Sequence, residues 1–245
     1  MTFTIVAMDE EKKLLGLASA SCGLFSGNLL PLYGCLGNYL GAVQAYPSMK
    51  LKRRLVDYLS KDGSLETLAG SLEALDPHIQ YRQIGVLDRL GNRFVYSGDR
   101  VSTSAGHLLG ANYLIVGNML ERTECLQAMA DTFEAEADAA LAYRLIKALE
   151  ACKKAGGQKI GGKPLKDRTA VLLVIGEDNY PSIDLRVNMS ENAVEDLRRQ
   201  YVTYKIYDGF LSTCETDPEK LPALSAQESL MPFAPDIFRV DKENS

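Results

Sequence analysis

Hydroxyl side chains alternate along two short runs near the start of the chain and could together form a polar site. Residues 2–8 and 14–21 are rich in β-forming residues and flank a charged segment, so they predict a β-hairpin. A tight turn centred on Glu11 and Lys12 sets the register. In that register, one face of the hairpin carries a cluster of four hydroxyl groups, from Thr2, Thr4, Ser19 and Ser21. Such a cluster could orient a catalytic group or relay a proton.

The cysteines and histidines limit the other kinds of chemistry. The five cysteines are odd in number, widely spaced and never in a C-x-x-C pair, which argues against a disulfide framework or a zinc ribbon. With only His78 and His107, a histidine-rich metal site is excluded, and Ser-His or Cys-His catalysis must use one of the two. We therefore expect no metal, and we interpret the cysteines as small buried residues: Cys22, Cys35, Cys125, Cys152 and Cys214.

Charge and hydropathy exclude several classes of partner. The chain has 27 Lys and Arg against 32 Asp and Glu, a net charge of -5, which argues against nucleic-acid binding. The uncharged stretch 14–49 is broken by polar residues and glycines, so it falls short of a membrane span. Acidic residues at 9–11 come too early for a signal peptide. We expect a cytoplasmic protein with no membrane contact. The glycines between 23 and 37 fit no phosphate-binding fingerprint, and we expect no cofactor.

Strands and helices alternate in groups along the rest of the chain. After the hairpin, the patterns predict further strands at 41–46, 81–88, 93–97, 113–117, 168–175 and 182–187. They predict helices from Pro47 to Gly63, over 65–75, around 125–133 and 141–152, and from Ser190 onward. Hairpin-linked strands imply antiparallel sheets, and the helix pairs imply a helical layer on each outer face. This favours an α+β fold, a four-layer αββα sandwich with two antiparallel sheets inside.

Composition changes near the C-terminus. Four prolines follow Gly209, at 218, 222, 232 and 235, and they argue against any helix there. We expect one domain over residues 1–208 and a C-terminal extension over 209–245 that wraps the domain or is partly mobile.

Several short segments together resemble a family of uncharacterised bacterial proteins placed with the N-terminal-nucleophile (Ntn) hydrolases, domain of unknown function 1028. The segments occur in the family's order at 1–7, 16–21, 44–46, 81–86, 105–107, 117–120 and 184–187. The resemblance covers roughly residues 1 to 208 and implies the αββα fold, but supplies no substrate. The stretches 22–39 and 151–167 depart from the family's pattern and could reshape the pocket.

The Ntn resemblance gives Thr2 a possible role. A small second residue permits removal of Met1, and Thr2 would then carry both a hydroxyl nucleophile and a free α-amino group. That amine has an ordinary pKa of about 7.7–8.0, so it could act as the general base for its own hydroxyl. Ser19, Ser21 and Thr4 would orient the amine or relay a proton. The expected reaction is transfer of an acyl group from a small-molecule amide to water.

Thr4 is also expected to contact the substrate, as are three further residues. Asn118 is the first candidate donor to the oxyanion, because it lies at a strand end before a helix; Gln44 is the second. Asn118 could instead cap that helix. His107 could bind substrate, serve as a base for Cys22 or Cys35, or be a satisfied structural histidine.

Two other functions remain open at this point. In proteasome-type threonine hydrolases an Asp and a Lys assist the nucleophile, whereas Ser21 and the Gln44 region stand at the matching places here. The chain could therefore be a non-catalytic Ntn-like binding or assembly protein, or a Cys-dependent hydrolase. Domains of this kind often self-associate, and we expect a homo-oligomer.

Overall fold

The computed structural model describes residues 2–34, 38–61, 63–102, 104–177 and 180–220. The chain divides into two compact units, Met1–Leu197 and Arg198–Ser245. All of the candidate site residues named above fall in the first unit. In the part of the chain that the structure describes, no helix is long and apolar enough to cross a membrane.

The first two strands form the predicted hairpin. β1 (Thr2–Asp9) pairs antiparallel with β2 (Leu14–Ser21), and Met8 lies opposite Leu15. The turn places Lys13 at a φ of 52°, and the Asp9 carboxylate accepts the Lys12 N–H at 3.0 Å. Thr2 lies opposite Ser21 and Thr4 opposite Ser19, so the predicted register is confirmed.

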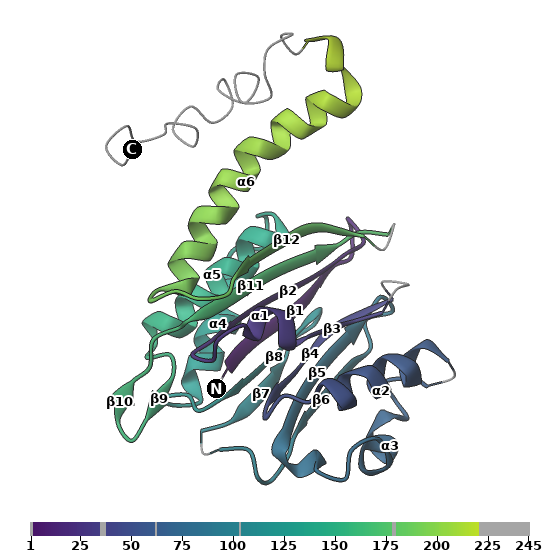
Figure 1. The fold of residues 1–245 in the computed structure, drawn as a ribbon, viewed down its shortest axis with the longest axis vertical. Coiled ribbons are helices and arrows are strands. Elements are labelled where there is room, and N and C mark those ends of the chain that lie inside the picture. The colour runs from purple at the N-terminus through teal and green to yellow at the C-terminus, as the bar shows by residue number, and fades with distance from the viewer. Residues whose placement is uncertain (1, 35–37, 62, 103, 178–179, 221–245) are drawn as a thin grey trace, which may run out of the picture. The chain divides into compact units, whose positions relative to one another are not determined.

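This hairpin lies at the centre of a six-stranded antiparallel sheet. The order is β12-β11-β2-β1-β8-β7, so β1 has a partner on both sides (Figure 1). The other four strands are β7 (Gly106–Leu109), β8 (Tyr113–Asn118), β11 (Thr169–Ile175) and β12 (Pro181–Val187). Strand β7 was not predicted: its four residues show mixed burial and form the edge of the sheet.

A second antiparallel sheet has the order β3-β4-β5-β6. Its strands are β3 (Pro31–Tyr33), β4 (Tyr39–Ala45), β5 (Arg82–Asp88) and β6 (Arg93–Ser97). The glycine-rich stretch that begins at Gly23 contains β3 and a short helix, α1 (Ser26–Leu29). A small hairpin of β9 (Lys159–Ile160) and β10 (Lys163–Pro164) lies apart from both sheets in the pairing. The described strands pair only antiparallel, which confirms the predicted α+β class.

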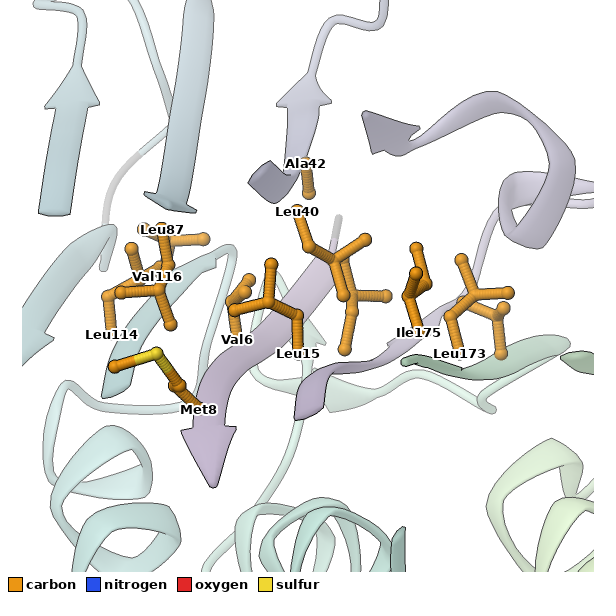
Figure 2. Close-up of a cluster of buried hydrophobic side chains, with 12 residues drawn as sticks. Val6, Met8, Leu15, Leu40, Ala42, Leu87, Leu114, Val116, Leu173 and Ile175 are labelled. Atoms are coloured by element: carbon orange, nitrogen blue, oxygen red, sulfur yellow. The ribbon is translucent and has the colours of Figure 1, made fainter. Parts of the chain in front are cut away.

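An apolar core fills part of the space between the two larger sheets. Side chains of β1, β2, β8 and β11 meet Leu40, Ala42 and Leu87 from the four-stranded sheet (Figure 2). Gly85 lets the sheets approach closely, because a Cβ there would lie 2.7 Å from Leu114 Cδ1. Burial of these aliphatic groups holds the two sheets together.

Helices cover other surfaces of the two sheets. α4 (Glu124–Ala135) contacts β7 and β8, and α5 (Leu141–Lys154) contacts β1, β2 and β11. On the four-stranded sheet, α2 (Met49–Ser60) and α3 (Leu68–Leu75) share a second apolar cluster with residues of β3, β4 and β5. Ser48 caps α2, its Oγ accepting the Leu51 N–H at 3.1 Å.

The last long helix extends further than the sequence suggested. α6 (Ala193–Thr216) continues through Gly209, where the expected extension begins, and is followed by the short helix η2 (Pro218–Lys220). One glycine costs a helix only about 1 kcal/mol, whereas the first proline, Pro218, comes after the helix has ended. The rest of the expected extension, residues 221–245, lies outside the described residues.

Candidate functional site

At one end of the space between the two larger sheets, the buried side chains are polar. β1 alternates, so Thr2 and Thr4 lie on the same face as the core residue Val6. Seven polar side chains meet at this end, each exposed by 3% or less: Thr2, Thr4, Ser19, Ser21 and Asn118 from the six-stranded sheet, and Gln44 and Gln83 from the four-stranded sheet. The four hydroxyl residues of the predicted cluster are therefore brought together.

Thr4 connects the hydroxyl cluster with the opposite sheet. Its Oγ1 lies 2.7 Å from Ser19 Oγ and 2.7 Å from Gln44 Oε1. An amide oxygen can only accept, so the Thr4 hydroxyl donates to Gln44. Thr4 is thus held by the network, and Gln44 lies at the hydroxyl cluster.

Thr2 lies at the outer end of the same cluster. Its hydroxyl donates to Ser21 Oγ at 3.2 Å, and Ser21 Oγ also accepts the Gly23 N–H at 3.1 Å. On the other side of strand β1, Thr2 is opposite Asn118, the last residue of β8. Thr2, Ser21 and Asn118 therefore lie side by side at the ends of three adjacent strands.

Gln83 is the centre of the network and was not predicted as a site residue. Its Oε1 accepts from Gln44 Nε2 at 2.7 Å and from Asn118 Nδ2 at 2.9 Å. Its Nε2 donates to Ser97 Oγ and to the Gly117 carbonyl, both at 2.9 Å. The amide is fully buried, with donors and acceptors on both ends satisfied. Gln83 therefore fixes the orientation of both neighbouring amides.

The sequence contains part of the information that marks Gln83 as a site residue, but it does not reveal the partner of Gln83. Within β5, Gln83 alternates with Ile84, which faces the helices, and lies on the side of Leu87, which faces the other sheet. A polar residue at a core-facing position of a buried strand is itself informative. Its partner Gln44 is opposite it on β4, a pairing between distant segments that local pattern does not reveal.

The structure places Asn118 in the polar cluster and His107 outside it. Asn118 lies in the cluster and does not cap a helix, because α4 begins only at Glu124. His107 is exposed on β7, and the described contacts do not bring it into the hydrogen-bond network. Its neighbour Gly106 is closer, since the Gly106 carbonyl accepts from Gln83 Nε2 at 3.2 Å.

Cys22 directly follows Ser21 and is partly buried. Burial raises the pKa of its thiol, so the thiol is a weaker nucleophile near neutral pH than an ordinary cysteine. None of the described contacts joins Cys22 to a histidine, and His78 is exposed beside Asp76, whose carboxylate accepts its N–H. Cys35, the other cysteine considered as a nucleophile, lies outside the described residues.

Metal-ligating side chains do not gather at this site. Among the residues that the structure describes, no group of three or more His, Cys, Asp or Glu is arranged to hold a metal ion. The groups available for chemistry here are hydroxyls and side-chain amides, which suit proton transfer and the binding of a carbonyl oxygen.

Comparison with known proteins gives a family and a fold. The model of a family of unknown function (DUF1028) matches residues 2–197. The crystal structure of protein SPO2555 from Silicibacter pomeroyi, assigned to the same family model, is 26% identical, with a TM-score of 0.71 over 88% of this chain and 90% of that chain. Anbu from Hyphomicrobium sp. strain MC1 is 9% identical, with a TM-score of 0.39 over 89% of this chain and 100% of that chain. No curated protein matches.

Proposed function

The chain belongs to the family of unknown function DUF1028, and we propose that it is an N-terminal-nucleophile hydrolase that cleaves an amide bond of a small molecule. Thr2 is the nucleophile once Met1 has been removed. One observation carries this proposal: Thr2 begins the central strand β1 and lies within a buried cluster of hydroxyl and amide groups. Its hydroxyl has a hydroxyl partner, Ser21 Oγ, at 3.2 Å.

The proposal includes the four-layer αββα sandwich of that enzyme class. Two features support it: the apolar core between the two larger sheets, and the helices that pack on each of them. In this arrangement α4 and α5 form one outer layer and α2 and α3 the other. Because a fold alone does not give an activity, the proposed activity depends on the residues of the site.

The chemistry needs no histidine. While Met1 is attached, the nitrogen of Thr2 is an amide and is not basic; its removal leaves an amine that can take the hydroxyl proton. Thr2 Oγ1 then bonds to the substrate carbonyl carbon, and the C–N bond breaks as the amine product leaves with that proton. Water hydrolyses the resulting ester, which releases the acid and restores the hydroxyl.

The surrounding residues have proposed roles that follow from their positions. Ser21 and Ser19 hold the hydroxyl and amine of Thr2 in orientation, and Thr4 links them to Gln44. Asn118 uses one N–H for Gln83 and keeps a second for a substrate oxygen. His107, exposed on the edge strand, is at most a contact for the outer part of the substrate.

The test uses the full chain made without an N-terminal tag. Intact mass spectrometry first measures the loss of Met1. An electrophilic β-lactone is then added; Thr2 Oγ1 attacks its carbonyl, the ring C–O bond opens, and the ring oxygen takes the proton, so the whole probe mass is gained. We expect one adduct, located on Thr2. Thr2→Ala should abolish it, Thr2→Ser should keep it, and the control Thr216→Ala on α6 should not change it.

Two results would contradict the proposal. A chain that has lost Met1 but forms no Thr2 adduct lacks a competent nucleophile. A chain that retains Met1 in the cell cannot use this mechanism in that form.

A second candidate is a non-catalytic binding or assembly protein of the same fold. The observation that favours it is the burial of the site: Thr2 is 2% exposed and Asn118 is 1% exposed. A satisfied buried network can serve only to specify the fold. Under this candidate Thr2→Ala leaves ligand binding intact. The Cys-dependent alternative is weakened by the raised pKa of Cys22.

Cellular location, assembly state and partners are also part of the proposed function. We propose a cytoplasmic homo-oligomer that needs no metal or cofactor and binds neither nucleic acid nor membranes. Light scattering coupled to size-exclusion chromatography measures the oligomeric state, and a monomeric mass would contradict that part.

A further inference from the structure

Gln158 is a buried glutamine to which the proposed mechanism has so far given no role. It follows α5, in the stretch 151–167 that departs from the family's pattern, and it is 3% exposed. Its main chain forms an isolated antiparallel bridge with Leu120. Its side-chain Oε1 accepts the Cys22 N–H at 3.0 Å. Gln158 is therefore attached to two segments that leave the six-stranded sheet.

These two attachments place Gln158 across the end of β1 at Thr2. β1 lies between β2 and β8, and Thr2 is paired with the last residue of each. Cys22 directly follows β2, and Leu120 comes shortly after β8. A residue that bridges Leu120 with its main chain and reaches Cys22 with its side chain therefore spans from the β8 side to the β2 side of β1.

The orientation of the Gln158 amide is fixed by Cys22. A backbone N–H only donates, and an amide nitrogen does not accept, so the oxygen must face Cys22. The nitrogen, Nε2, is then buried without a hydrogen-bond partner among the described residues. A buried amide N–H without a partner is destabilising, and a bound ligand oxygen would satisfy it.

The other amides of the site are already engaged. Gln44 and Asn118 each donate to Gln83, and Gln83 donates to the Gly117 carbonyl. Gln158 is the side-chain amide here whose nitrogen makes no hydrogen bond among the described residues.

A cavity adjoins the same region. It has a volume of about 250 Å³, and its wall includes Met119 and Leu120, which follow Asn118, and Lys159, which follows Gln158. Lys159 and Glu121 on this wall form an ion pair at 2.5 Å, so their charges compensate each other. The cavity thus borders the residues that follow Asn118 and Gln158 in the chain.

We infer that Gln158 Nε2 donates a hydrogen bond to the carbonyl oxygen of the substrate that Thr2 attacks. This inference rests on the proposed function and makes Gln158 a catalytic residue of that site. As Thr2 Oγ1 bonds to the carbonyl carbon, the C=O electron pair moves onto the oxygen, and a preplaced N–H stabilises the charge as it develops. Gln158 thereby supplies a donor in addition to the remaining N–H of Asn118.

The test measures acylation of Thr2 by the β-lactone probe in Gln158→Met, which keeps the length of the side chain but cannot donate. Probe concentration is varied to separate the maximal acylation rate from half-saturation. Removal of one oxyanion donor typically lowers a rate by about 10²–10³-fold. We expect a fall of at least about tenfold in the maximal rate with half-saturation little changed. Gln127→Met, at an exposed glutamine on α4, is the matched control and should acylate like the parent chain.

Gln158→Glu is the second variant, because its carboxylate can still accept the Cys22 N–H while losing the donor. Its maximal rate should fall as well, and urea unfolding checks that both variants fold. Acylation at the parent rate in either folded variant would overturn the inference, and so would failure of both to fold, since the residue would then be needed for structure. If the parent chain has lost Met1 and still forms no adduct, the proposed function itself fails.

Discussion

A buried ion pair next to the polar cluster shows how single residues hold the site. Asp76, directly after α3, accepts from Arg82 at 2.9 Å, with side chains only 9% and 13% exposed. Arg82 also donates to the Tyr46 carbonyl at 2.7 Å. Arg82 directly precedes Gln83. The ion pair and the bond to Tyr46 therefore fix the start of β5, which carries Gln83, relative to the end of β4, which carries Gln44.

The Asp76 carboxyl makes stability depend on pH. Burial acts to raise its pKa, but hydrogen bonds from His78 N–H and Arg82 outweigh this and lower the pKa below its usual value. The stabilisation is therefore fully present above the unfolded pKa of about 3.9 and is lost as pH falls through the lower folded pKa. Asp76→Asn should reduce the free energy of unfolding at pH 7 by about 3 kcal/mol, because Arg82 is left without its charge partner.

Urea unfolding at a series of acidic and neutral pH values measures both effects. The variant should lose less stability than the parent chain on acidification. Asp57→Asn, at an exposed position of α2, is the control and should resemble the parent. A parallel fall of the two curves would show that Asp76 is not responsible.

Close contact between strands β4 and β5 depends on a glycine. A Cβ at Gly41 would lie 2.3 Å from the Gly85 carbonyl oxygen and 2.9 Å from Val86 Cα, both backbone atoms that no rotamer change can move. At Gly85 the first obstacle is Leu114 Cδ1 at 2.7 Å, the end of a flexible side chain. An added methyl group would therefore have to displace backbone atoms at Gly41 but only a side chain at Gly85.

Gly41→Ala should lower the free energy of unfolding by about 3 kcal/mol, at the upper end of overpacking costs, because the strands themselves must separate. Gly85→Ala should cost about 1 kcal/mol. Gly70→Ala, on the exposed side of α3 with open space around it, should stabilise by up to about 1 kcal/mol. Denaturant midpoints give this order, and an equal loss at Gly41 and Gly85 would contradict it.

The elements that the sequence predicted are those whose pattern is local. The β1–β2 hairpin follows from alternation and a short charged turn, and its register brought Thr2, Thr4, Ser19 and Ser21 together as expected. Gln83 and Gln158 were missed because their partners lie 39 and 136 residues away along the chain, in contacts that alternation cannot specify. Strand β7 was missed because four edge residues carry too little pattern.

At the scale of the whole molecule, the family match and the first compact unit both end at Leu197. Our proposed boundary after residue 208 leaves that unit complete and removes only the later part of α6 and the residues beyond that helix. A chain ending at Phe210, which keeps that buried side chain of α6, should unfold with a free energy within about 0.5 kcal/mol of the full chain, as expected for changes outside a core.

Thermal and urea unfolding of the two lengths test this, with Thr2 acylation as a second measurement. A large loss of stability in the shorter chain would mean that the extension is part of the folding unit. Unchanged stability with lost acylation would instead assign the extension to the site.

The central place of β1 in its sheet has a consequence for timing during synthesis. Asn118, the partner of Thr2 on β8, follows it by 116 residues, and Gln158 is later still. At about 5–20 residues per second, on the order of ten seconds pass before β8 leaves the ribosome. In that interval β1 lacks its partner β8, so under the proposed function an aminopeptidase can reach Met1 on the unfinished chain. If Thr2 is the nucleophile, the topology thus leaves time for Met1 to be removed before the site closes.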